Sequence, residues 1–120
     1  TRIYVTSSLA AIAAGGVHGL AHITGGGLTE NIPRVLPDEC AAHLQRASWP
    51  RTELFTWLQQ TAGIDEAEMC RTFNNGIGMV LVLDAAAALA ACATAAHSPL
   101  LPPTQVADAS WVTLAVVRVL

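Results

Sequence analysis

The stretch from residue 22 to residue 37 reads His22-Ile23-Thr24-Gly25-Gly26-Gly27-Leu28-Thr29-Glu30-Asn31-Ile32-Pro33-Arg34-Val35-Leu36-Pro37. Its three successive glycines follow an apolar run, which predicts that an element of regular structure ends in backbone able to approach a ligand closely. A glycine nest presents several N–H donors to an anion because no Cβ shields the backbone. The side chains of Thr24, Glu30, Asn31 and Arg34 would then complete a polar pocket.

The same segment also has a simpler interpretation as a tight turn after a strand, and composition alone favours the turn. The segment matches neither G-x-x-x-x-G-K-[ST] nor G-x-G-x-x-G, the two standard phosphate-binding patterns. The chain also contains no lysine. Any cationic contact to a phosphate would therefore come from arginine, a metal ion or another polypeptide.

The length of 120 residues is that of one small domain, and we expect residues 1–120 to form it. The sequence is 52% apolar and 12% charged, whereas a typical domain is about 25% charged. Such a domain is expected to hide part of its surface against a partner domain or subunit. A start at Thr1 rather than methionine suggests a fragment of something longer.

The charge pattern excludes a nucleic-acid-binding protein, because the net charge is -3 and the six arginines are scattered. Three cysteines, at positions 40, 70 and 92, show no C-x-x-C spacing. This argues against a disulfide framework and a zinc site, and we expect reduced thiols in the cytoplasm. His18 and His22 have the spacing of two helical metal ligands, but the glycines around them argue against a helix, so no metal site is expected.

The apolar run from residue 77 to residue 96 raises the question of a membrane span, because Asp84 is its only charge. The first half of the run is rich in strand formers, and the second half is mostly alanine, a helix former. A strand that leads into a helix capped near Asp84 explains this change better than a membrane span.

Hydrophobic spacing, prolines and glycines predict the remaining elements. We expect one helix at 3–14, ended by two glycines, and one at 52–63, with Thr52 as the N-cap. A second, shorter helix is expected to open with residues 65–70 and to be broken by Asn74-Asn75-Gly76. Strands are expected at 17–23, 40–47, 76–83 and 110–120, with a short helical turn or loop at 28–34. A loop is expected around the prolines at 99, 102 and 103. This order predicts an α+β domain in which helices cover a mixed or antiparallel sheet.

A second notable stretch is Arg71-Thr72-Phe73-Asn74-Asn75-Gly76-Ile77-Gly78-Met79. Its glycines flank the start of the predicted strand, where a ligand or another backbone segment can approach closely. An ordinary helix-to-strand turn with Arg71 on the surface explains the pattern equally well. Nucleophilic catalysis finds no support, because no cysteine sits in an activating context and no G-x-S-x-G is present.

Together these segments resemble the carboxy-terminal domain of aminoimidazole ribonucleotide (AIR) synthase, also called phosphoribosylformylglycinamidine cyclo-ligase. The matching stretches are Thr1-Arg2-Ile3-Tyr4-Val5, His22-Ile23-Thr24-Gly25-Gly26-Gly27-Leu28, Glu30-Asn31-Ile32-Pro33-Arg34-Val35-Leu36-Pro37, Phe55-Thr56-Trp57-Leu58-Gln59 and Arg71-Thr72-Phe73-Asn74. They cover residues 1 to about 83 in the family's order. The resemblance implies a sheet-and-helix sandwich with partly ferredoxin-like topology.

The resemblance also implies an enzyme of purine synthesis that closes the imidazole ring of formylglycinamidine ribonucleotide, with ATP activating the formyl oxygen. The family's amino-terminal domain supplies most of the ATP and Mg²⁺ site and the dimer interface, so this chain alone is expected to bind no cofactor and to be inactive. The expected partners are that domain, the nucleotide substrate and, in the complete cytoplasmic enzyme, a second copy.

By resemblance, the hydroxyl of Thr24 and the backbone N–H groups of Gly25, Gly26 and Gly27 would bind a phosphate or the activated oxygen. His22 would donate to developing charge and is the one catalytic candidate. The remaining candidates for substrate or phosphate contacts are Asn31, Arg34, Arg71 and Asn74.

The resemblance thins after Leu83, where the family's usual final strands are replaced by Trp111-Val112-Thr113-Leu114 and an apolar run. Asn75 stands where the family often has a small or sulfur-bearing residue. Two alternatives stay open: a stand-alone binding module that keeps the fold, and another enzyme of the same superfamily that acts on selenophosphate or thiamine phosphate. The segment from Glu30 to Arg34 favours AIR synthase over the second alternative.

Overall fold

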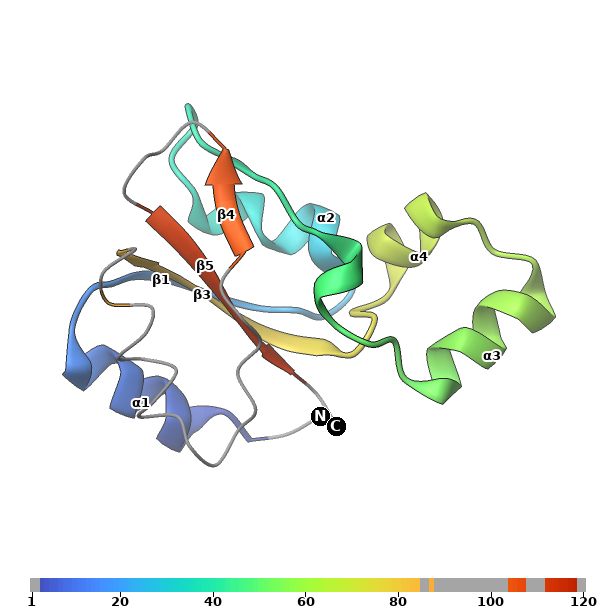
Figure 1. The fold of residues 1–120 in the computed structure, drawn as a ribbon, viewed down its shortest axis with the longest axis horizontal. Helices are drawn as coiled ribbons and strands as arrows, with labels where there is room; N and C mark the ends of the chain where they lie inside the picture. Colours follow the sequence, from blue (N-terminus) through green and yellow to red (C-terminus); the bar gives the residue numbers. More distant parts are fainter. Residues whose placement is uncertain (1–2, 85–86, 88–103, 108–111, 119–120) are drawn as a thin grey trace.

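The computed structural model describes residues 3–84, 87, 104–107 and 112–118 (Figure 1). The helices are α1 (Val5–Ala14), α2 (Gly27–Asn31), α3 (Glu53–Ala62) and α4 (Glu66–Thr72), with short 3-10 helices η1 (Pro33–Val35) and η2 (Arg46–Ser48). The strands are β1 (Val17–His22), β2 (Ala41–Ala42), β3 (Ile77–Asp84), β4 (Thr104–Ala107) and β5 (Val112–Arg118).

The five strands form one sheet in the order β1-β3-β5-β4-β2, and each described pair is antiparallel. The long strand β3 lies between β1 and β5, with Leu81 opposite Leu20 on one side and opposite Ala115 on the other. Helices and an antiparallel sheet together confirm the α+β class.

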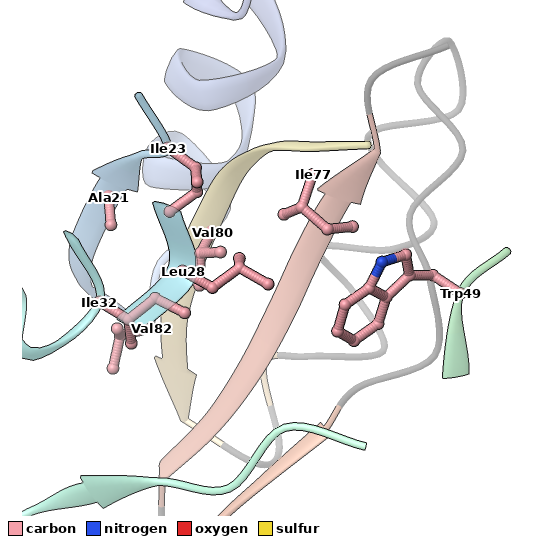
Figure 2. Close-up of a cluster of buried hydrophobic side chains, with 8 residues drawn as sticks. All are labelled: Ala21, Ile23, Leu28, Ile32, Trp49, Ile77, Val80 and Val82. Carbon is pink, nitrogen blue, oxygen red and sulfur yellow. The ribbon is translucent and has the colours of Figure 1, made fainter. Parts of the chain in front are cut away.

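Successive side chains of β3 point to opposite faces of the sheet. Side chains on both faces are buried. Leu81 and Leu83 pack with Tyr4 and Ala11 around α1. The opposite face packs against α2, and Figure 2 shows the residues of this cluster: Ala21, Ile23, Leu28, Ile32, Trp49, Ile77, Val80 and Val82. The sheet is therefore covered by α1 on one face and by α2 on the other, whereas α3 extends beyond it (Figure 1).

Most of the predicted elements are confirmed. Helix α1 ends at Gly15, whose N–H donates to the carbonyl of Ile12 at 3.0 Å. Helix α3 has Thr52 at its N-cap position, although no side-chain capping bond forms, and it ends at Gly63 with φ +64. The Asn75-Gly76 turn also separates α4 from β3 as predicted.

The strand predicted at 40–47 was wrong in length. Only Ala41 and Ala42 join the sheet, by pairing with Ala107 and Val106 of β4, and the chain then turns into η2. Strand β4 was not predicted, because the prolines before it indicated a loop. The alanine-rich helix predicted after Asp84 lies outside the described residues, apart from Ala87, which is helical.

The apolar run that raised the question of a membrane span begins as strand β3. Within the described ranges, no helix is long and apolar enough to cross a membrane.

Candidate anion-binding loop

The glycine segment forms a short loop between β1 and α2, and the amide of Asn31 holds its backbone. Asn31 is buried, and its Nδ2 donates to the carbonyl oxygens of Gly27 at 2.8 Å, Gly25 at 3.1 Å and Thr24 at 3.5 Å. The N–H of Gly27 also donates to the carbonyl of Thr24 at 3.0 Å. One side-chain amide therefore gathers the loop carbonyls on one side.

This arrangement fixes the direction of the loop N–H groups. The described peptide bonds are trans, and in a trans peptide the carbonyl and the following N–H point in opposite directions. Because the carbonyls of Thr24 and Gly25 point to Asn31, the N–H groups of Gly25 and Gly26 point away from it. Thr24 and Gly25 are exposed, so this side of the loop can accept an anion without displacing protein atoms.

Arg34 forms a hydrogen bond with the Asn31 side-chain amide. The Nη1 of Arg34 donates to the Oδ1 of Asn31 at 3.3 Å, and its Nη2 lies 3.8 Å from a carboxylate oxygen of Glu30. The Arg34 side chain is nevertheless 64% exposed, so its remaining N–H groups are open to solvent. Asn31 thus connects the glycine loop to a positive charge of the kind that binds phosphate well.

The second and third glycines have backbone conformations that other residues rarely adopt. Gly26 has φ +94, and a Cβ there would lie 2.6 Å from a Glu30 carboxylate oxygen. Gly27 has φ +56 and packs against the carbonyl oxygens of Cys70 and Phe73, at the end of α4. The glycines are therefore required by local structure, while Gly25 has open space around it.

His22 lies at the end of β1, on the other face of the sheet. Strand alternation places its side chain opposite those of Ala21 and Ile23, which pack towards α2. The His22 ring instead meets the Tyr4 ring edge-on, with 5.9 Å between the centroids. The structure brings His22 close to the glycine loop along the chain but directs its side chain towards α1, and the catalytic role stays a prediction.

Arg71 and Asn74 belong to the segment that packs beside the loop, and both have structural partners. The Nε of Arg71 lies 3.3 Å from a carboxylate oxygen of Glu68, one turn earlier on α4. The Oδ1 of Asn74 accepts the N–H of Gly76 at 3.1 Å, which builds the turn into β3. The two predicted segments are thus neighbours in the fold, and substrate contacts by these two side chains stay a prediction.

A cavity of about 410 Å³ is bordered by α2 and by the chain that follows it as far as Trp49. It is lined by Leu28, Thr29, Ile32, Pro33, Leu36, Cys40, Ala41, Ala42, Leu44, Arg46, Trp49 and Cys70. Among the described residues, none of the predicted site residues lines this cavity. The candidate site is therefore an exposed loop rather than an enclosed pocket.

Two further residues shape the site environment. Glu30, which the sequence placed in the predicted polar pocket, limits the space beside Gly26 and faces Arg34, and the spacing of four residues between this acid and base is a signal for such a pair. The carbonyl of Cys70 packs on Gly27, and no sequence pattern indicates that contact. In the described part of the chain, no group of three or more His, Cys, Asp or Glu side chains is placed to hold a metal ion.

The fold and the loop define an α+β domain with an exposed, glycine-rich turn whose Asn31 clamp also binds an arginine. Residues 1–107 match the family model described as "AIR synthase related protein, C-terminal domain". The chain belongs to this family.

Curated relatives carry a more specific name. The chain is 68% identical over 94 residues to a phosphoribosylformylglycinamidine cyclo-ligase of Albidiferax ferrireducens and to one of Polaromonas sp., in both cases over 78% of this chain and 27% of the relative. It is 57% identical over 98 residues to the protein of the same name from Bordetella petrii, over 80% of this chain and 28% of the relative. The chain thus spans about a quarter of the length of these relatives.

Proposed function

We propose that residues 1–120 are a single carboxy-terminal domain of a phosphoribosylformylglycinamidine cyclo-ligase. That enzyme closes the imidazole ring of formylglycinamidine ribonucleotide with the use of ATP. Membership of the AIR synthase family and identities of 57% to 68% to proteins of this name support the proposal. The complete domain has the partly ferredoxin-like sandwich topology of that family.

The rest of the enzyme supplies the larger share of the chemistry. Roughly three quarters of the relatives' length lies outside the match, and we assign ATP and Mg²⁺ mainly to an amino-terminal domain there. The complete enzyme acts in the cytoplasm as a homodimer. The chain described here forms one wall of the cleft that receives the nucleotide substrate.

The hydrogen bonds from the Asn31 amide to the loop carbonyls are the main observation that supports this site. This amide directs the N–H groups of Gly25 and Gly26 outwards, and its Oδ1 accepts a hydrogen bond from Arg34. These donors are fixed before substrate arrives, so they stabilise a phosphate or a developing oxyanion without a further cost of reorganisation. The hydroxyl of Thr24 adds a donor at the exposed start of the loop.

The remaining candidates have roles that depend on the second domain. His22 donates a proton or hydrogen bond to the substrate only if a substrate group reaches the α1 side of the sheet. Arg71 and Asn74 lie on the segment beside the loop and contact the substrate there. The single substitutions His22→Gln and Arg71→Gln separate these roles. The loss of a substrate contact lowers kcat or raises KM, and each variant removes one contact.

The decisive experiment uses the full-length enzyme and the substitution Gly25→Ala. Position 25 has open space for a Cβ, so the variant keeps the fold while a methyl group obstructs the anion. We expect kcat/KM for ATP-dependent ring closure to fall at least tenfold, with unchanged thermal unfolding. The matched control is Thr61→Ala, on the exposed surface of α3. A Gly25→Ala enzyme with the full rate would refute the loop as the substrate site.

A further inference from the structure

Asn75 is a completely buried polar residue that is not among the predicted site residues. Its exposed fraction is 0% and its φ is +50. Within the described residues, no other residue apart from glycine has a positive φ. The Oδ1 of Asn75 is buried without a hydrogen-bond partner in this part of the chain. A left-handed backbone and an unpaired buried oxygen both cost free energy, and they persist where the surrounding structure or a functional site requires the residue.

The side chain and the backbone of Asn75 hold two other segments of the domain. Its Nδ2 donates to the carbonyl oxygens of Met69 at 2.9 Å and Phe73 at 3.4 Å. The same nitrogen lies 3.7 Å from the Sγ of Cys70. The backbone carbonyl of Asn75 accepts the Nε1–H of Trp49 at 3.3 Å, and Trp49 belongs to the buried cluster beside α2. Asn75 therefore ties the end of α4 to the core next to α2.

The end of α4 is also the surface on which the glycine loop rests. Gly27 packs against the carbonyl oxygens of Cys70 and Phe73, and the Phe73 oxygen is one that Asn75 holds. Asn31 donates to the carbonyl of Gly27 itself at 2.8 Å. Gly27 thus lies between two buried amides. One amide holds the loop, and the other holds the backbone against which the loop packs.

We propose that Asn75 is a positioning residue for the glycine loop and acts through the end of α4 rather than by contact with the substrate. Its amide fixes the Phe73 carbonyl, which packs on Gly27. Because a packed interior transmits strain, a shift at the end of α4 moves the loop with it. The Gly27 N–H, which donates to the carbonyl of Thr24 at 3.0 Å, reports that movement. The effect on catalysis rests on the proposed function of the loop, whereas the effect on loop position does not.

Nuclear magnetic resonance of the full-length protein, labelled with ¹⁵N-glycine, tests the loop position. Asn75→Gly removes the amide together with its unpaired oxygen, and glycine adopts a positive φ readily. We expect the Gly27 amide resonance to move and its hydrogen exchange to become at least tenfold faster. The resonance of Gly15, at the end of α1, should stay in place. An unmoved Gly27 resonance overturns the proposal.

A matched control separates positioning from a general loss of stability. Leu83→Val shortens a buried side chain in the cluster on the α1 side of the sheet, away from α4. We expect it to leave the Gly27 resonance in place, because the resonances of a folded protein report its local structure. The same change in Leu83→Val as in Asn75→Gly means that Asn75 acts on stability alone, and the proposal then fails. If Asn75→Gly does not fold, Asn75→Ser replaces it under the same criterion, because a hydroxyl donates to one carbonyl only.

Turnover of the full-length enzyme gives a separate result. We expect kcat/KM for ring closure to fall at least tenfold in Asn75→Gly. A full-rate Asn75→Gly enzyme beside an impaired Gly25→Ala enzyme overturns the proposal. A moved Gly27 resonance beside a full-rate Gly25→Ala enzyme refutes the loop as the substrate site but supports Asn75 as the residue that positions it. Failure of the proposed function and failure of this inference are therefore distinguishable.

Discussion

Gly27 packs so closely on Cys70 that a Cβ at position 27 would overlap the Cys70 carbonyl oxygen. The Phe73 carbonyl oxygen would lie only 2.8 Å from the same Cβ. These neighbours are backbone atoms, which cannot rotate away as the end of a side chain can. The contact fixes α2 against α4 and so sets the position of the whole glycine loop.

The substitution Gly27→Ala is therefore expected to destabilise the domain strongly. The overlap and the φ of +56 both oppose a side chain, and we expect a loss of about 3 kcal/mol in the free energy of unfolding. Urea unfolding measures it. Gly25→Ala is the matched control, because its Cβ meets no atom within 4 Å. If Gly27→Ala unfolds at the same urea concentration as Gly25→Ala, the packing of α2 on α4 is not as described.

Loss of the Asn31 amide is expected to loosen the loop as well as to reduce stability. Asn31→Ala leaves the loop carbonyls without their buried donor, which costs about 1–3 kcal/mol. Hydrogen exchange of the Gly27 amide should accelerate, because the Thr24 carbonyl that accepts its hydrogen bond at 3.0 Å is no longer held in place by Asn31. The control Arg34→Gln removes an exposed partner of Asn31. Equal exchange rates in the two variants would argue against the Asn31 clamp.

Glu66 makes the stability of the domain depend on pH. Burial raises the pKa of Glu66, but hydrogen bonds from Arg51 and Gln59 and the charges of Arg51 and Arg46 outweigh burial, so the pKa lies below its usual 4.5. The native state therefore holds this proton less tightly than the unfolded chain does. The stabilisation is present above pH 4.5 and is lost as the pH falls through the lower, native pKa.

The substitution Glu66→Gln tests this dependence. Urea unfolding between pH 7 and pH 3 should show a smaller loss of stability for Glu66→Gln than for the unchanged chain. Glu53→Gln, at the exposed start of α3, serves as the control for the loss of one carboxylate. Parallel pH profiles for the unchanged chain and Glu66→Gln would contradict the assignment.

The same carboxylate suppresses the reactivity of a cysteine. Burial raises the pKa of the Cys70 thiol, and the nearby negative charge of Glu66 raises it further. The Sγ of Cys70 lies 3.8 Å from a Glu66 carboxylate oxygen. Since the thiolate is the reactive form, Glu66→Gln should accelerate alkylation of Cys70 by iodoacetamide at pH 8. Peptide mass mapping measures the rate, with Cys40 as the internal reference. An unchanged ratio of the two rates would show that Glu66 does not control this thiol.

Local signals predicted much of the fold. The glycines after residue 14 and at position 63 end helices as expected, because each adopts a positive φ that other residues avoid. Strand β3 was also predicted, because its continuous run of apolar residues is rich in strand formers. The length of strand β2 was overestimated because its pairing depends on β4, which is distant in sequence. No local pattern reports such a partner.

The candidate site was readable in part. The sequence placed Asn31 and Arg34 near the glycines, and the structure connects all of them. The direction of the His22 side chain was not predictable, because it depends on which face of β1 packs against α2.

The strand order has a consequence for the newly made chain on the ribosome. Strands β1 and β3 can pair once Asp84 has emerged, but the other edge of β3 receives its partner only after Val112–Arg118 has been synthesised. Ala41 and Ala42 likewise wait for Thr104–Ala107. An open, apolar strand edge is prone to bind other chains. The nascent polypeptide therefore passes through a vulnerable interval in which β3 is paired along one edge only, and chaperones would protect it there.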